Sequence, residues 1–249
     1  LGSMVRFLIF LIFSYKYFSF KSKDKKLKKY IKYSGTRLPV DLSSWIVTFA
    51  DRLMLYDLKG AGDSGIYSVG YTIGQGIEVL FQSINKAYVP YSFDHFKNKR
   101  DLNDLSKNAL NLYTMYFFVT FTIILFSKEI ISLLDESYSD SLMVVIIILL
   151  SYLLNGLKLL FQVTMDFNIK YIKIKSLLWM ISAFSNILLN IWLIPKYSYN
   201  GAAYATFISY MIIFIPVLIF SNRAIKIKYP IKKMLQILFL SLAILPFYG

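Results

Sequence analysis

Charged and amide side chains recur at helical spacing inside several apolar stretches of this sequence. At about 100° per residue, the polar members of each stretch fall on one helix face, within an arc of roughly 80–100°. Cationic groups gathered in this way suit a phosphate or pyrophosphate group, and a carboxylate beside them could carry a coupling proton or sodium ion. The members of interest are Arg52, Gln75, Glu78, Lys86, Asn155, Lys158 and Gln162, and Asp51 sits beside the arc that holds Arg52.

Polar faces inside apolar helices have two interpretations. A charge at the bilayer centre costs roughly 2.5–3.5 kcal/mol on insertion scales, so such faces either line a water-filled cavity or pair across helix interfaces. Glu78 and Asn155, near the middle of their stretches, favour the cavity. Lys86, near the end of its stretch, favours pairing or snorkelling to the headgroups. The Asp51–Arg52 pair fits either interpretation.

The elements that must position these residues are long and apolar. Hydrophobic residues make up 57% of the 249 residues and come in blocks long enough to cross a bilayer. Blocks of this length without strict alternation predict helices rather than barrel strands. The sequence therefore predicts an all-α fold, a polytopic transmembrane helical bundle of about eight spans in one domain over residues 1–249. The expected spans are 4–20, 38–58, 64–90, 109–127, 141–165, 176–195, 200–220 and 233–249.

The loops between these spans alternate in charge. Loops near 21–37, 97–107, 170–175 and 223–233 are basic, whereas 59–64 and 195–200 are not and 128–140 is net acidic. By the positive-inside rule the basic loops face the cytoplasm. This pattern predicts a multi-pass membrane protein whose basic loops face the cytoplasm, with membrane lipids as its surroundings.

Composition argues against several other classes of protein. The net charge of +14 lies in short loops rather than on a folded basic surface, so nucleic acid is not an expected partner. The chain has no cysteine and one histidine, so neither a metal site nor a cofactor is expected. That histidine, His95, is expected to be a solvated loop residue. There is no phosphate-binding glycine loop of the nucleotide-hydrolysing kind.

Short motifs in a fixed order carry a family resemblance. The run "RLPVDLSSWIVTFADRLML" (37–55) precedes "GIYSVGYTIGQGIEVLFQSINKAYVPY" (65–91), and "YNGAAYATFIS" (199–209) follows later. The chain resembles the Wzx-type polysaccharide flippases of the multidrug/oligosaccharidyl-lipid/polysaccharide exporter superfamily, over about residues 4–249. The matching positions are Pro39, Asp51, Arg52, Gly65, Tyr67, Ser68, Pro90, Gly201, Ala202, Ala203, Ala205 and Thr206.

The resemblance implies a multi-pass transporter of the bacterial inner (cytoplasmic) membrane rather than an enzyme. Members of this family move undecaprenyl-pyrophosphate-linked glycans between leaflets by alternating access of two helical lobes. The implied partners are a lipid-linked glycan, other polysaccharide-assembly proteins and the lobe that precedes this one, since the chain is expected to be the C-terminal lobe of a 12–14 helix protein. The implied substrate-binding residues are Arg52, Lys86, Lys158, Gln75, Asn155 and Gln162, and the implied ion-coupling residues are Glu78 and Asp51.

Two other functions stay open at this point. A drug or cation exporter of the same superfamily would share the fold, and its diagnostic acidic residues could lie outside this chain. A membrane glycosyltransferase or polymerase would need carboxylates or histidine at a membrane face. The loops here are short, about 16 residues at most, and none contains an Asp-x-Asp metal motif.

Overall fold

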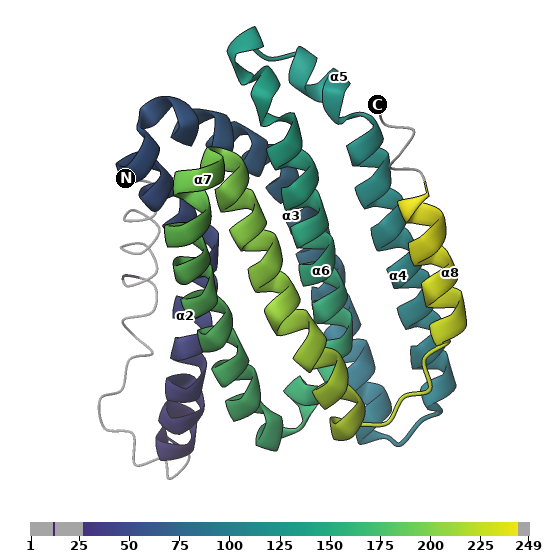
Figure 1. Ribbon diagram of the computed structural model, residues 1–249. Coiled ribbons are helices and arrows are strands. Elements are labelled where there is room, and N and C mark those ends of the chain that lie inside the picture. The colour runs from purple at the N-terminus through teal and green to yellow at the C-terminus, as the bar shows by residue number, and fades with distance from the viewer. Residues whose placement is uncertain (1–11, 13–26, 244–249) are drawn as a thin grey trace. The chain divides into compact units, whose positions relative to one another are not determined.

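The computed structural model describes residue 12 and residues 27–243, and every regular element in those residues is a helix (Figure 1). The all-α prediction is therefore confirmed for this part of the chain. The elements are α2 (Leu27–Lys59), α3 (Ala61–Lys97), α4 (Leu102–Leu125), α5 (Ser127–Ser132), the 3-10 helix η2 (Glu136–Ser141), α6 (Leu142–Phe167), α7 (Ile169–Ala224) and α8 (Ile231–Leu242). The chain divides after Thr36 into two compact units, and the unit from Arg37 onward contains the helices from α3 to α8.

Three helical segments among the described residues are long and apolar enough to cross a membrane. They are Leu102–Leu125, Glu136–Phe167 and Lys170–Ala224. With the blocks of apolar sequence, they identify a membrane protein. The expected first span, 4–20, lies outside the described residues apart from Ile12, and the last is described only to Ala243. The expected spans 38–58 and 64–90 lie in α2 and α3, which are not among the three segments. The total of about eight spans therefore stays a prediction.

Helix α7 is a helical hairpin without a loop. At 1.5 Å per residue its 56 residues would extend roughly 84 Å, far more than a bilayer's hydrocarbon core. Ser198 breaks the helix with φ 50° and ψ −131°, and the two arms run back side by side in Figure 1. The Ser182 hydroxyl donates to the Ser209 carbonyl across the arms at 2.7 Å. The expected break between 195 and 200 is confirmed.

Gly201 allows the two arms of α7 to approach closely at this reversal. A Cβ added at Gly201 would lie 2.3 Å from the carbonyl oxygen of Leu193, which is backbone and cannot move aside as a side chain could. Only a residue without a side chain allows the second arm to begin so close to the first.

Helix α6 is the central element, and it packs against both α3 and α7. Its apolar window is 83% buried, against 39% for those of α4 and α7. The Gly70–Gly74 pair lies at the α3–α6 contact: a Cβ at Gly74 would lie 2.6 Å from Ile148 Cγ2, and one at Gly70 2.9 Å from Val144 Cγ1. Two glycines four residues apart thus allow α3 and α6 to approach closely.

The connections sort by charge between the two ends of the bundle. The α3–α4, α6–α7 and α7–α8 connections, all basic, lie together at the lower end in Figure 1, whereas the acidic segment around α5 and η2 lies at the upper end. This separation agrees with the alternation predicted from the loops. Which end faces the cytoplasm stays a prediction of the positive-inside rule.

Two expected boundaries are wrong. Helix α2 begins at Leu27 rather than near residue 38. Helix α3 continues past Pro90 to Lys97 because one proline removes a single backbone donor, a loss that a long packed helix tolerates. His95 consequently lies in the last turn of α3 and is buried, not solvated: its Nδ1 lies 3.0 Å from the Tyr91 carbonyl oxygen.

Candidate functional site

The buried carboxylate of Asp51 joins three helices. It is fully enclosed, and its Oδ2 accepts hydrogen bonds from the Tyr67 hydroxyl of α3 and, at 3.2 Å, from the Thr206 hydroxyl of α7. Its Oδ1 accepts from the backbone N–H of Arg52 at 2.8 Å. Hydrogen bonds to an ionised group are about twice as strong as neutral ones, so this carboxylate holds α2, α3 and α7 together.

The next residue, Arg52, turns its side chain to an aromatic face. Its guanidinium carbon lies 4.4 Å from the centre of the Tyr71 ring. Tyr71 in turn accepts a hydrogen bond from the Tyr152 hydroxyl of α6 at 2.8 Å, and the Tyr152 ring lies 6.0 Å from that of Tyr210 on α7. A cation over a ring is worth about 0.5–2 kcal/mol, more where water is excluded. These tyrosines extend the polar contacts from Arg52 into the centre of the bundle.

Glu78 and Asn155 meet across the α3–α6 interface. The Asn155 Nδ2 donates to Glu78 Oε1 at 3.3 Å. Glu78 is partly exposed while Asn155 is 4% exposed, so the carboxylate stands between the packed interior and the accessible face of α3. The two mid-span residues expected to share a site are therefore in contact.

Lys158 is the most deeply buried cation among the described residues, at 2% exposure. Its Nζ lies 4.0 Å from the centre of the Trp179 ring on α7. No ion pair joins it to a carboxylate of the described residues, whereas Asp166, two turns further along α6, pairs with Lys175 at 2.5 Å. An ammonium group held in this way keeps its hydrogen-bond donors available to a ligand.

The remaining predicted residues differ in their surroundings. Gln162 is buried on α6, and its Oε1 has no hydrogen-bond partner within the described part of the chain. Gln75 is partly exposed on α3, and Lys86 is exposed near the basic end of that helix, where the interpretation as an end charge is the better one. The structure thus places Asp51 and Arg52 at α2–α3–α7 contacts, Glu78 with Asn155 at the α3–α6 contact and Lys158 at the α6–α7 contact, and it leaves Lys86 exposed on α3.

The residues expected to line a water-filled cavity are packed against protein on α6 and α7. Ser151, Asn155 and Lys158 of α6 are buried, as are Ser182 and Asn186 of α7. The α2 and α3 members are more open, since Arg52, Gln75 and Glu78 are all partly exposed. A ligand would therefore meet the α2 and α3 groups first.

Sequence reasoning from helix faces missed the partners of these groups. Tyr67 and Thr206 bind Asp51, and Trp179 covers Lys158, yet none was predicted to act at the site. The signal for two of them was present: Tyr67 and Thr206 belong to the motifs that carry the family resemblance. Tyr67 and Thr206, the latter 155 residues from Asp51 in the sequence, thus converge on one carboxylate.

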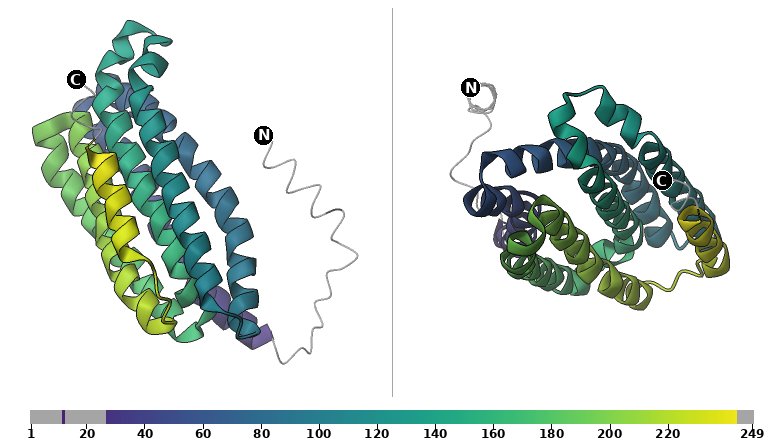
Figure 2. Two further views of the ribbon diagram at one scale, coloured as in Figure 1. Left: turned by 90° about the vertical axis from the view of Figure 1, so that its right-hand side faces the viewer. Right: turned by 45° about the horizontal axis from the view of Figure 1, so that its top comes forward.

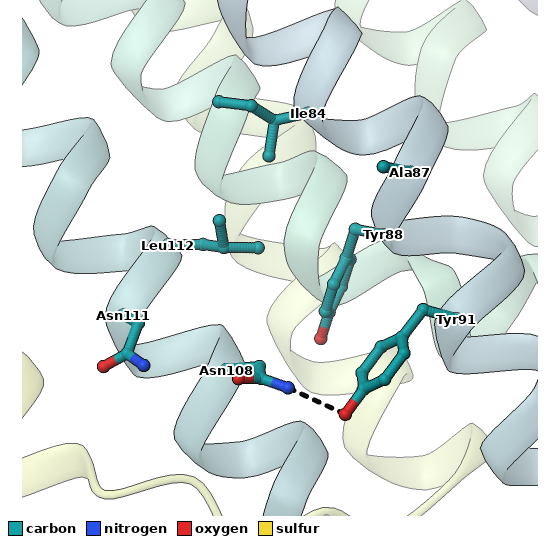
Figure 3. Close-up of a pocket in the computed structure, with 7 residues that line it drawn as sticks. All are labelled: Ile84, Ala87, Tyr88, Tyr91, Asn108, Asn111 and Leu112. Carbon is teal, nitrogen blue, oxygen red and sulfur yellow. Dashed lines mark hydrogen bonds between the residues drawn. The ribbon is translucent and has the colours of Figure 1, made fainter.

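A smaller pocket lies apart from these contacts, near the basic end, between α3 and α4. Its volume is about 290 Å³ and its wall is mostly apolar (Figure 3). The Asn108 Nδ2 donates to the Tyr91 hydroxyl at 2.7 Å there. None of the predicted site residues lines it. No cluster of three or more metal-ligating side chains occurs among the residues that the structure describes.

Part of the chain matches a known protein family. Residues 1–96 match the family model of polysaccharide biosynthesis proteins. This match confirms the expected resemblance and indicates involvement in polysaccharide synthesis or export. It includes the Asp51–Arg52 pair and the whole polar face of α3. No curated protein and no solved structure matches the chain.

Proposed function

We propose that this protein flips undecaprenyl-pyrophosphate-linked oligosaccharide across the bacterial inner membrane by alternating access, for polysaccharide assembly. The match of residues 1–96 to polysaccharide biosynthesis proteins supports the process, and the apolar helices support the location. Neither motifs nor side-chain clusters of the described residues suggest bond-breaking chemistry, so we propose transport rather than catalysis.

The observation that carries the proposal is the pair of cations held over aromatic rings. Arg52 lies over Tyr71 and Lys158 over Trp179, and neither forms an ion pair within the described part of the chain. A cation inside a membrane protein is costly unless something compensates its charge. A pyrophosphate group would supply that charge and accept the free N–H donors, with Arg52 suited to bidentate contact.

Amide groups beside these cations suit a glycan. Gln75, Asn155 and Gln162 offer donors and acceptors of the kind that hydroxyl-rich ligands use, and the buried Asn155 Oδ1 and Gln162 Oε1 have no partner in the described residues. Glu78, at the boundary between interior and accessible face, is the proposed coupling residue. Asp51 is the second, although its hydrogen bonds also suit a structural role.

The test uses the complete gene product as its host encodes it. Reconstituted into liposomes, it should move a fluorescent undecaprenyl-pyrophosphate oligosaccharide from one leaflet to the other, measured by an impermeant quencher. A matching deletion strain should lose surface polysaccharide and hold the precursor on the cytoplasmic leaflet. Normal surface glycan in that strain, together with a drug-sensitivity phenotype, would instead assign a drug exporter.

A further inference from the structure

A second, larger cavity is lined by none of the predicted site residues. Its volume is about 510 Å³, and it lies between α4, α6, the second arm of α7, and α8. This is within the range of about 300–1,000 Å³ that small-molecule sites occupy. Its wall is almost wholly aromatic and aliphatic, with Phe117, Phe161, Phe214 and Leu218 as its larger members.

Most of the polar groups of this cavity gather at one end. Ser221, Asn222 and Tyr229 lie at or beside the α7–α8 connection, and the fourth polar lining residue, Tyr113, lies on α4. The Tyr229 hydroxyl is buried and has no hydrogen-bond partner among the described residues. The ligand that fits such a wall is apolar along most of its length and carries a hydrogen-bond acceptor at one end.

The same end is strongly basic. Between Ser221 and Leu242 the sequence has no Asp or Glu. The side chains of the five basic residues of this segment are exposed. They are Arg223, Lys226, Lys228, Lys232 and Lys233. An acceptor that binds here would therefore be an anion.

The basic α7–α8 connection is held in place by a hydrogen bond to α4. The Ser106 hydroxyl of α4 donates to the Lys228 carbonyl at 2.7 Å. Helix α8 packs along α4, and Figures 1 and 2 show the connection crossing from the end of α7 to that pair of helices. The charges are thus positioned by a specific contact on one side of the apolar cavity.

We propose that this cavity holds one acyl chain of an anionic glycerophospholipid, with its phosphate against the α7–α8 connection. The lipid is already present in the surrounding membrane, and anionic headgroups attract basic segments at its surface. An undecaprenyl chain is far longer than a fatty acyl chain and exceeds the cavity. The site is separate from the Arg52 and Lys158 groups and does not depend on the transported substrate.

The experiment counts bound lipids. The complete protein is placed in nanodiscs of equal phosphatidylglycerol and phosphatidylcholine, extracted gently, and its retained lipids are identified by native mass spectrometry. Phosphatidylglycerol should be retained in preference to phosphatidylcholine. The variant Lys226→Gln/Lys228→Gln/Lys232→Gln should reduce that preference by on the order of fivefold for each lysine.

Matched variants distinguish lipid binding at this site from a general effect of surface charge. Lys99→Gln/Lys170→Gln/Lys173→Gln removes three exposed lysines from other basic connections and should leave the preference unchanged. Leu218→Trp adds bulk inside the cavity and should reduce retention, whereas Leu188→Trp, on the exposed face of the first α7 arm, should not. Thermal unfolding of each variant verifies its fold.

Several results would overturn the proposal. Equal retention of the two phospholipids would show that the basic residues of the α7–α8 connection do not select the lipid. Equal loss in the two triple variants would show a surface-wide effect, and retention unaffected by Leu218→Trp would place the lipid elsewhere. Retention of added undecaprenyl phosphate in place of phosphatidylglycerol would assign the cavity to a polyprenyl chain. Because the triple variants change only exposed side chains, the test stands even if Leu218→Trp fails to fold.

Discussion

The Thr206 hydroxyl donates a hydrogen bond to the Asp51 carboxylate at 3.2 Å, across 155 residues of sequence. The contact joins the second arm of α7 to α2, two helices that no connection places together. The Tyr67 hydroxyl completes the arrangement from α3. One buried carboxylate thus fixes how three helices sit around the candidate site.

Removing that carboxylate should destabilise the protein. In Asp51→Ala the Tyr67 and Thr206 hydroxyls lose their acceptor in a buried position, at a cost of about 1–3 kcal/mol for each buried group left unpaired. Thermal unfolding of the purified protein in detergent measures the effect. Asp57→Ala, an exposed carboxylate on the same helix, is the control and should unfold like the parent. Equal unfolding of both variants would contradict the structural role of Asp51.

Substitution of Lys158 should slow transport, whereas substitution of Lys196, a lysine in a similar aromatic contact, should not. Lys196 also lies over a tryptophan ring, Trp192 at 4.2 Å, but both are exposed. Lys158→Met keeps the apolar stem and removes the donors. A lost hydrogen bond to a charged group costs about 1.5–3 kcal/mol, so flipping in liposomes should fall roughly tenfold or more. Lys196→Met should flip at the parental rate, and an equal fall in both would remove Lys158 from the proposed headgroup site.

Glu78→Gln should separate charge from packing. A glutamine amide oxygen can still accept the hydrogen bond that Asn155 donates, so folding should be preserved. If Glu78 carries the coupling ion, transport by this variant should no longer respond to an imposed proton or sodium gradient. The flipping rate is measured with and without each gradient. A response equal to that of the parent protein would assign coupling to another residue.

Two glycines of α3, Gly74 and Gly76, offer a matched test of helix packing. Gly74→Leu places side-chain atoms where Ile148 and the Leu149 backbone already lie, and overpacking of this kind costs about 1–3 kcal/mol. Gly76→Leu lies two residues away and meets nothing within 4 Å. Thermal unfolding should therefore separate the two variants. A loss of stability in Gly76→Leu as large as in Gly74→Leu would contradict the close α3–α6 contact.

Topology is testable because this sequence has no cysteine of its own. Ser139→Cys, in the acidic segment, should react with an impermeant maleimide applied outside the inner membrane. Lys99→Cys and Lys226→Cys, in the basic connections, should react only after the membrane is broken. All three positions are exposed, so accessibility through the membrane decides the result. The reverse pattern would invert the predicted orientation.

Helical periodicity predicted which residues share a face but not what those faces meet. The arcs placed Asn155 and Lys158 together on one stretch, and the structure confirms that both lie on the buried side of α6. Their partners, Glu78 and Trp179, come from other helices. Which helices pair depends on tertiary packing, and a period of 3.6 residues carries no information about it.

The predicted end of a span was wrong where the tendency of proline to end a helix competed with packing. Pro90 suggested the end of a span, and His95 was therefore placed in solvent. In the structure the helix continues for seven residues beyond that proline, and the Tyr91 and His95 rings pack together with centres 4.4 Å apart. The break at Ser198, by contrast, was predictable because a proline and a small-residue run flank it.

The loop-free reversal at Ser198 also makes the α7 sequence intolerant of insertions and deletions. One added residue between Ser198 and Thr206 would rotate everything beyond it by about 100° around the helix axis. Thr206 would then point away from Asp51, and Ser209 away from Ser182. A flexible loop would absorb such a change, but here Gly201 already touches the Leu193 backbone. Length variation among related chains should therefore collect in the other connections, while the spacing from Pro195 to Ser209 stays constant.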